Sequence, residues 1–122
     1  MAINESVENY LETILILSQK SHAVRSIDVA TELNFKKSSV SVAMKNLREK
    51  EYISITDDGN IVLTDAGKEI ANMVYEKHTF LSNWLKSIGV DEKIAVEDAC
   101  RIEHVISNES FEAMKKYVNK NT

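Results

Sequence analysis

The chain has 122 residues, of which 43% are hydrophobic and 28% charged, and this composition is typical of one soluble globular domain or a small domain with an extension. Three glycines, no proline and a single cysteine indicate a mostly helical chain without an internal disulfide. No apolar run reaches the roughly 18 residues that cross a bilayer, and residues 1–5 do not resemble a signal peptide, so we expect a cytoplasmic protein without a membrane partner.

Charge is segregated along the chain, although the net charge is only −4. Residues 20–50 contain seven Lys or Arg and three acids, a local charge of +4, so the remainder carries −8. A basic segment in an acidic protein is the local electrostatic footprint of a polyanion. We therefore expect nucleic acid to bind through residues 20–50.

The first predicted element is a helix over residues 5–20, where apolar side chains recur at helical spacing. Asn9 and Glu12 are two of its polar positions and stand three residues apart, which places them on one face. The pattern alone favours an ordinary solvated helix face at these two positions.

Two short helices follow and predict a helix-turn-helix. Ser26 is expected to cap the first helix, Asn34 to end it in the left-handed conformation, and Lys36 to open the second. The side chains expected to contact DNA are Ser26, Lys36, Lys37, Ser38, Ser39, Ser41, Lys45 and Arg48. The alternative is an ordinary helical hairpin with a basic solvent face.

A β-hairpin is predicted directly afterwards, with strands at residues 52–55 and 61–63 and a turn at 56–60. A two-stranded hairpin after a helix-turn-helix is the wing of a winged helix. Thr64 is expected to cap the next helix. These features predict a DNA-binding domain over residues 1–64.

The remaining residues, 65–122, predict a helical domain. A long helix over 65–87 ends before Gly89, a second helix runs from about residue 91 through Val105, and Ser107 caps a last one. Because these helices are few, we expect a homodimer in which apolar side chains of the two copies bury one another. The residues expected at this interface are Trp84, Leu85, Phe111 and Met114.

The second of these helices contains the cluster Cys100, Glu103 and His104, at positions i, i+3 and i+4 of one helical face. A thiolate, a carboxylate and an imidazole form a ligand set for a first-row transition metal. The alternative is a small buried cysteine, a solvated glutamate and a histidine with ordinary hydrogen bonds. This pattern by itself does not decide between the two.

The chain resembles the DtxR/MntR family of metal-dependent transcriptional repressors. The resemblance is carried, in order, by Glu8-Asn9-Tyr10-Leu11-Glu12, Ser38-Ser39-Val40-Ser41, Leu63-Thr64-x-x-Gly67, His78, Gly89-Val90-Asp91-Glu92 and Cys100-Arg101-x-Glu103-His104. It implies a mainly α fold, with a winged helix-turn-helix followed by a helical metal-binding and dimerisation domain. It also implies a homodimer that binds double-stranded operator DNA when loaded with metal and controls metal homeostasis genes.

The metal ligands that the resemblance implies are Asn9, Glu12, His78, Cys100, Glu103 and His104. Asn9 stands where the family usually has Met or Asp. Cys100 is typical of iron-responsive members, whereas Glu12 is typical of manganese-responsive ones. The soft thiolate favours Fe(II), with Mn(II) second and Co(II), Ni(II) or Zn(II) as possible substitutes.

Two other function classes are compatible with parts of the pattern. A winged-helix regulator with Cys100 as a redox switch requires an exposed, reactive thiol. A metalloenzyme is disfavoured, because the sequence has no further nucleophile motif, Gly-rich phosphate loop or separate acid pair. We therefore expect a regulator that is not an enzyme and has no small-molecule substrate.

Overall fold

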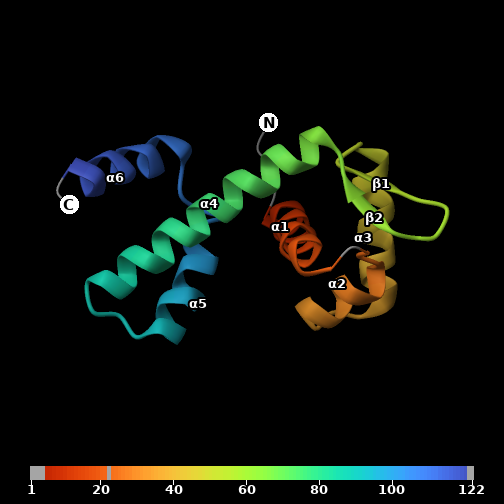
Figure 1. Cartoon of the computed structure of the whole chain (residues 1–122), viewed down its shortest axis with the longest axis horizontal. Helices are drawn as coiled ribbons and strands as arrows, with labels where there is room; N and C mark the ends of the chain where they lie inside the picture. The colour runs from red at the N-terminus through yellow and green to blue at the C-terminus, as the bar shows by residue number, and fades with distance from the viewer. Residues whose placement is uncertain (1–4, 22, 121–122) are drawn as a thin grey trace. The chain divides into compact units, whose positions relative to one another are not determined.

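The computed structural model describes residues 5–21 and 23–120 and divides the chain into two compact units, residues 1–72 and 73–122. The elements of the described residues are α1 (Glu5–Lys20), α2 (Ser26–Leu33), α3 (Lys37–Glu49), β1 (Ile53–Ile55), β2 (Ile61–Leu63), α4 (Asp65–Ser87), α5 (Glu92–Ile102) and α6 (Asn108–Lys120) (Figure 1). The predicted mainly α fold with a winged helix-turn-helix is confirmed. None of the described helices is both long and apolar enough to cross a membrane.

In the first unit, α2 and α3 form the predicted helix-turn-helix. Asn34 ends α2 in the left-handed conformation, with φ 58° and ψ 44°. The prediction that Ser26 caps α2 is wrong by one residue, because the helix begins at Ser26 and its N-cap is Arg25. The backbone N–H of Arg25 instead donates to the carboxylate of Asp28 at 2.9 Å. An acid in the first turn is therefore what holds this helix start.

The core of the first unit lies between these helices and the β-hairpin. Leu11 and Ile14 of α1, Val29 of α2 and Val40 of α3 are completely buried. The hairpin pairs antiparallel, with Ser54 opposite Val62. The backbone N–H of Ile61 donates to the carbonyl of Val24 at 2.7 Å, which joins the hairpin to the segment between α1 and α2. An isolated hairpin of this size is marginally stable, so these contacts hold the wing in place.

Thr64 caps α4, as predicted, and also ties the start of this helix to the turn before β1. Its hydroxyl accepts from the backbone N–H of Gly67 at 3.2 Å and donates to the carbonyl of Glu51 at 2.7 Å. A Cβ at Gly67 would overlap the carbonyl oxygen of Tyr52, so only glycine fits there. In the Thr64-x-x-Gly67 motif, the threonine thus caps α4 and the glycine lets the backbone of α4 approach the Tyr52 carbonyl.

In the second unit, α5 and α6 pack with the second half of α4. Phe80 of α4 and Phe111 of α6 meet edge to face, with ring centroids 5.5 Å apart. Ser107 caps α6 as predicted, because its hydroxyl accepts from the N–H of Ser110 at 3.0 Å. Since α4 runs without a break from residue 65 into the second unit, the predicted domain boundary between residues 64 and 65 stays a prediction.

Candidate metal centre and nucleic-acid interface

The C-terminal end of α5 positions the residues of the candidate metal centre. Helix α5 ends at Ile102, and Glu103 is its C-cap, with its N–H donating to the carbonyl of Ala99 at 3.0 Å. The predicted continuous helix through Val105 is therefore wrong, and His104 lies in the turn after the helix. Two consecutive N–H groups, of Val105 and Ile106, donate to the Ile102 carbonyl at 3.0 Å and tighten that turn.

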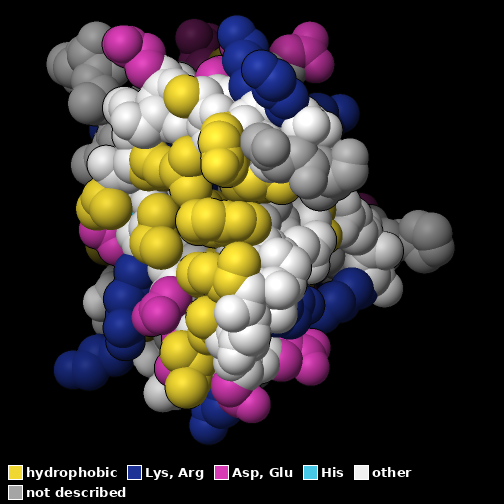
Figure 2. Space-filling view, turned by 90° about the vertical axis from the view of Figure 1, so that its left-hand side faces the viewer, with side chains coloured by type: hydrophobic (Ala, Val, Ile, Leu, Met, Phe, Trp, Pro, Cys, Tyr) yellow, Lys and Arg dark blue, Asp and Glu magenta, His cyan; other side chains and the backbone are white. Residues whose placement is uncertain are grey.

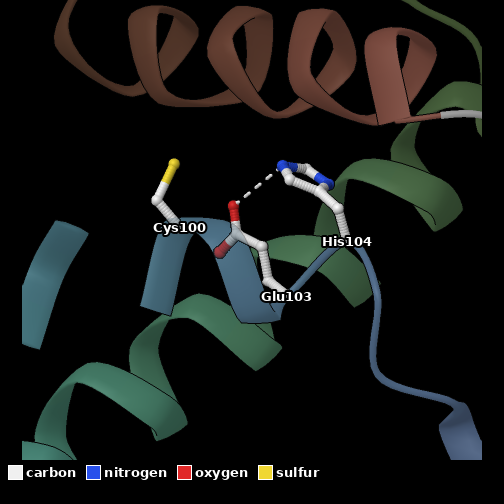
Figure 3. A group of neighbouring side chains, drawn as sticks. All are labelled: Cys100, Glu103 and His104. Atoms are coloured by element: carbon white, nitrogen blue, oxygen red, sulfur yellow. Dashed lines mark ion pairs between the residues drawn. The ribbon is translucent and has the colours of Figure 1, made fainter. Parts of the chain in front are cut away.

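This turn still brings together the three side chains that helical spacing predicts to be neighbours. The ligand atoms of Cys100, Glu103 and His104 all lie within 4.8 Å of one another (Figure 3). Two atoms that bind one metal ion at 2.0–2.3 Å are at most about 4.6 Å apart. The cluster therefore has the dimensions of a transition-metal site with only small adjustments of its side chains.

Glu103 is the centre of the cluster. One carboxylate oxygen, Oε2, lies 2.9 Å from Nδ1 of His78, which comes from α4. The other oxygen, Oε1, lies 3.3 Å from Nε2 of His104. The Glu103 side chain is completely buried and that of His104 is 2% exposed, whereas Cys100 is exposed at the edge. Three donors of nitrogen, oxygen and sulfur thus lie together within the second unit, and His78 adds a fourth donor beside Glu103.

This donor set is unlike a structural zinc site. Structural zinc is usually held by several cysteines with short paired spacings, whereas this cluster offers one thiol with oxygen and nitrogen donors. A mixed set of this kind suits Fe(II), Mn(II), Co(II) or Ni(II). A buried carboxylate is costly without a positive partner, and a bound divalent cation would supply one.

The two remaining predicted ligands, Asn9 and Glu12, belong to α1 of the first unit. Glu12 is buried, with 5% of its surface exposed, and Asn9 is half-buried. The backbone carbonyl of Asn9 accepts a hydrogen bond from the Thr13 hydroxyl at 2.8 Å, which leaves its side-chain amide out of that contact. A buried glutamate is rare in proteins, so its burial indicates a functional role for Glu12.

Helix α3 presents most of the predicted DNA contacts to solvent. The exposed residues are Lys36, Lys37, Ser38, Ser39, Ser41, Lys45 and Arg48, while Ser26 of α2 is half-buried. Helix α3 has no side-chain cap at its N-terminus, so the N–H groups of its first turn are available to an anion. Sequence reasoning missed Val42, which is 61% exposed on the same helix.

The second unit carries an apolar face. Figure 2 shows hydrophobic side chains gathered in a band on this side of the molecule. In the second unit, a hollow of about 310 Å³ is lined by Trp84, Ala113, Met114, Tyr117 and Val118. The prediction that Phe111 offers interface surface is wrong, because this side chain is 2% exposed and packs against Phe80. Tyr117, which is 71% exposed, was missed although it follows Met114 at helical spacing.

Two family profiles match the chain. Residues 2–60 match the N-terminal DNA binding domain of the iron dependent repressors. Residues 64–122 match the metal binding and dimerisation domain of the same group. Together these matches span nearly all of the chain.

Among similar proteins, an uncharacterized HTH-type transcriptional regulator of Methanocaldococcus jannaschii is 33% identical over 120 residues, covering 97% of this chain and 96% of the relative. The HTH-type transcriptional regulator MntR of Bacillus velezensis is 34% identical over 107 residues, covering 88% and 75%. Among solved structures, IdeR of T. acidophilum is 25% identical with a TM-score of 0.80, covering 98% of this chain and 55% of that chain. A protein of Sulfolobus solfataricus has the same fold, with 22% identity, a TM-score of 0.72 and coverage of 97% and 91%.

Proposed function

The chain belongs to the DtxR/MntR family of metal-dependent transcriptional repressors, whose members are regulators and not enzymes, and on this premise we propose that it binds operator DNA as a homodimer when it is loaded with Fe(II) or Mn(II). Its target genes would then be those of metal homeostasis, and its compartment the cytoplasm, where the DNA is. The observation that carries the proposal is the completely buried Glu103 carboxylate, which lies between two imidazoles and beside a thiol.

The proposed ligands in the second unit are His78, Cys100, Glu103 and His104. Their support is one buried carboxylate, with an imidazole nitrogen 2.9 Å from one oxygen, a second imidazole nitrogen 3.3 Å from the other, and the Cys100 sulfur within 4.8 Å. Glu12 and Asn9 of α1 complete the proposed set through the family resemblance. Fe(II) is favoured because Cys100 adds a soft thiolate, and Mn(II) is second.

The proposed DNA contact is α3 lying in the major groove. Its exposed lysines and arginine would neutralise phosphates, while its serines would form hydrogen bonds to base edges or phosphates. The uncapped N-terminus of α3, beside Lys36 and Lys37, would accept a phosphate oxygen on its N–H groups. Two copies of α3 in a homodimer would read two half-sites about one helical turn apart.

We propose that the metal acts by ordering. The bound ion would order its ligands and favour the spacing of recognition helices that the operator requires. A coupling of about 1–3 kcal/mol between metal and DNA binding, or roughly 5–150-fold in affinity, is enough for such a switch. The chain's own contribution is to hold Glu103 in a buried position where a cation is stabilising.

A titration of DNA binding under anaerobic conditions tests this proposal. A duplex recovered from a random-sequence library by the metal-loaded protein would be labelled and titrated with protein alone or with Fe(II), Mn(II) or Zn(II). We expect tighter binding with Fe(II) or Mn(II), and loss of that gain in His104→Ala. Equal affinity with and without metal would contradict the proposal.

Cys100→Ser separates the metal switch from the redox alternative, for which the exposed Cys100 thiol is the required group. For a metal switch, the serine variant should lose more affinity for Fe(II) than for Mn(II) and should still respond to metal. DNA affinity that follows oxidant and ignores metal in the wild-type protein, with the response lost in the variant, would instead indicate a redox switch.

A further inference from the structure

Val42 is an apolar side chain in an unusual place. It is 61% exposed on α3, the helix whose other apolar residues, Val40, Met44 and Leu47, are buried in the core of the first unit. With 100° between successive residues, Val42 points almost directly away from that buried face. Packing within the first unit therefore does not explain a valine at this position.

The neighbours of Val42 on the helix surface are all polar. Ser38 and Asn46 lie one turn before and after it, at four residues, and Ser39 and Lys45 lie at three. All four are exposed. The result is a single branched apolar group framed by two hydroxyls, an amide and an ammonium. A polar frame of this kind fits base edges and phosphates better than it fits the apolar centre of a protein interface.

We infer that Val42 contacts the C5-methyl group of a thymine in the major groove and makes the protein prefer an A·T pair at that point of each half-site. The inference rests on the proposed function, in which α3 enters the major groove. The thymine methyl is the apolar group that the major groove displays, and small apolar side chains are the groups that contact it. Val42 is also restricted at χ1 by its β-branch, so it loses little freedom when it binds.

Deoxyuridine tests this contact, because it differs from thymidine only in lacking the C5-methyl group. In a duplex recovered from a random-sequence library by the Mn(II)-loaded protein, each thymine would be replaced in turn by uracil. At one thymine per half-site, we expect the replacement to weaken wild-type binding by roughly fourfold, the factor that corresponds to one buried methyl-sized group. Val42→Ala should bind the thymine duplex more weakly by a similar factor and should no longer distinguish thymine from uracil.

Val62→Ala is the matched control. Val62 is also exposed, at 46%, but it lies on β2, so its truncation should leave the thymine-to-uracil ratio unchanged. Thermal unfolding of Val42→Ala should match that of wild type, because the side chain removed is exposed.

Two results would overturn the inference and leave the proposed function standing. One is wild-type binding that is insensitive to uracil at every thymine. The other is a Val42→Ala variant that keeps the full discrimination. Failure to recover any duplex, or binding that ignores metal, would instead remove the proposed function together with this inference. A Val42→Ala variant that changes oligomeric state in the absence of DNA would show that Val42 contacts a second copy of the chain, which also overturns the inference.

Discussion

At the scale of single residues, Glu103 is a buried charged side chain whose desolvation must be compensated. Its carboxylate is completely buried, and each of its oxygens lies near one imidazole nitrogen. A buried carboxylate without compensation costs several kcal/mol. A divalent cation would compensate it fully, so the arrangement is expected to be more favourable with metal than without.

Glu103→Gln should therefore weaken metal binding while the protein still folds. Glutamine has nearly the same shape and keeps an oxygen acceptor, so the fold should be retained, while the lost charge should lower Mn(II) affinity by about 100-fold or more. Isothermal titration calorimetry measures the affinity, and thermal unfolding without metal checks the fold. The matched control is Glu97→Gln, an exposed glutamate on the same helix. Equal Mn(II) affinity in the two variants would argue against Glu103 as a ligand.

Metal binding at this cluster should release protons and weaken as pH falls. Histidine and cysteine bind metal only in their deprotonated forms, so protons compete with the ion. Calorimetry of Mn(II) binding at one pH, in two buffers with different ionisation enthalpies, counts the protons released. Release of no protons, together with a Mn(II) affinity that does not change between pH 6 and 8, would contradict the assignment of these ligands.

Lys115 forms ion pairs with Glu76 and Glu112, and these should not change between pH 6 and 8. Hydrogen bonds to Glu112, and then to Glu76, raise the pKa of Lys115 above its usual 10.5. A raised lysine pKa gives stability that is complete below pH 10.5 and is lost only as pH rises through the raised value. The contribution of Lys115 is therefore constant across neutral pH, and a change between pH 6 and 8 arises elsewhere.

At the scale of elements, the connection between the wing and α4 depends on the absence of a side chain at Gly67. In an ordinary helix interior, Gly→Ala stabilises by about 1 kcal/mol through helix propensity. Here the added Cβ would overlap the Tyr52 carbonyl, and overpacking typically costs about 1–3 kcal/mol. We therefore expect Gly67→Ala to lower the free energy of unfolding, measured by urea denaturation. An increase would show that the close approach relaxes without cost.

The hairpin and its flanking residues are acidic, although they lie in the same unit as the basic helix α3. Residues 51–64 contain three acids, Glu51, Asp57 and Asp58, and no Lys or Arg. Asp57 and Asp58 are exposed in the turn of the hairpin, in the same unit as α3. If α3 binds DNA, these carboxylates would be repelled by phosphates.

Replacing both aspartates by asparagine should consequently tighten DNA binding, with a larger gain at 50 mM than at 200 mM salt because salt screens the repulsion. Fluorescence anisotropy at the two salt concentrations measures the effect. The double variant Glu92→Gln and Glu97→Gln makes the same change of charge on α5. An equal gain in that control would show a general effect of net charge and not a property of the wing.

The elements were largely predictable from the sequence, because each has a local cause. Periodic apolar residues, Asn34, Thr64 and Ser107 define helices and their ends through contacts within a few residues. The end of α5 was not predictable, since Cys100 to Val105 have no glycine or proline that would stop a helix. Phe111 was misassigned for a related reason: apolar spacing on α6 does not tell which side chains meet Phe80 in the same chain and which remain exposed.

The sequence was enough to predict which residues form the candidate site, but not how their side chains contact one another. Cys100, Glu103 and His104 were recognised by spacing, and their proximity holds although His104 lies beyond the helix. That Glu103 bridges the two histidines has no signal in the sequence, because His78 is 25 residues away. Val42 was overlooked because a single valine in a helix is usually buried, and only its exposure reveals it.

At the scale of the whole molecule, the apolar face of the second unit carries the proposed assembly. The hollow beside Trp84, Met114 and Tyr117 is open and apolar, and Tyr117 is 71% exposed. A homodimer would cover this face with its own copy, which is the common arrangement for a symmetric pair. The four donors of the second unit come from one chain, so a protomer should keep them after the dimer is broken.

Tyr117→Glu separates assembly from metal binding. A charge placed at the centre of an apolar interface would lose its hydration, so we expect the variant to sediment as a monomer at concentrations where wild type is a dimer. Calorimetry should find Mn(II) affinity within a few-fold of wild type, whereas operator affinity should fall by more than about 100-fold, because one recognition helix replaces two. Val62→Glu, which adds the same charge at an exposed valine of the first unit, should remain dimeric. A dimeric Tyr117→Glu would move the proposed interface away from this face, and a monomer that still binds the operator tightly would contradict the need for two copies.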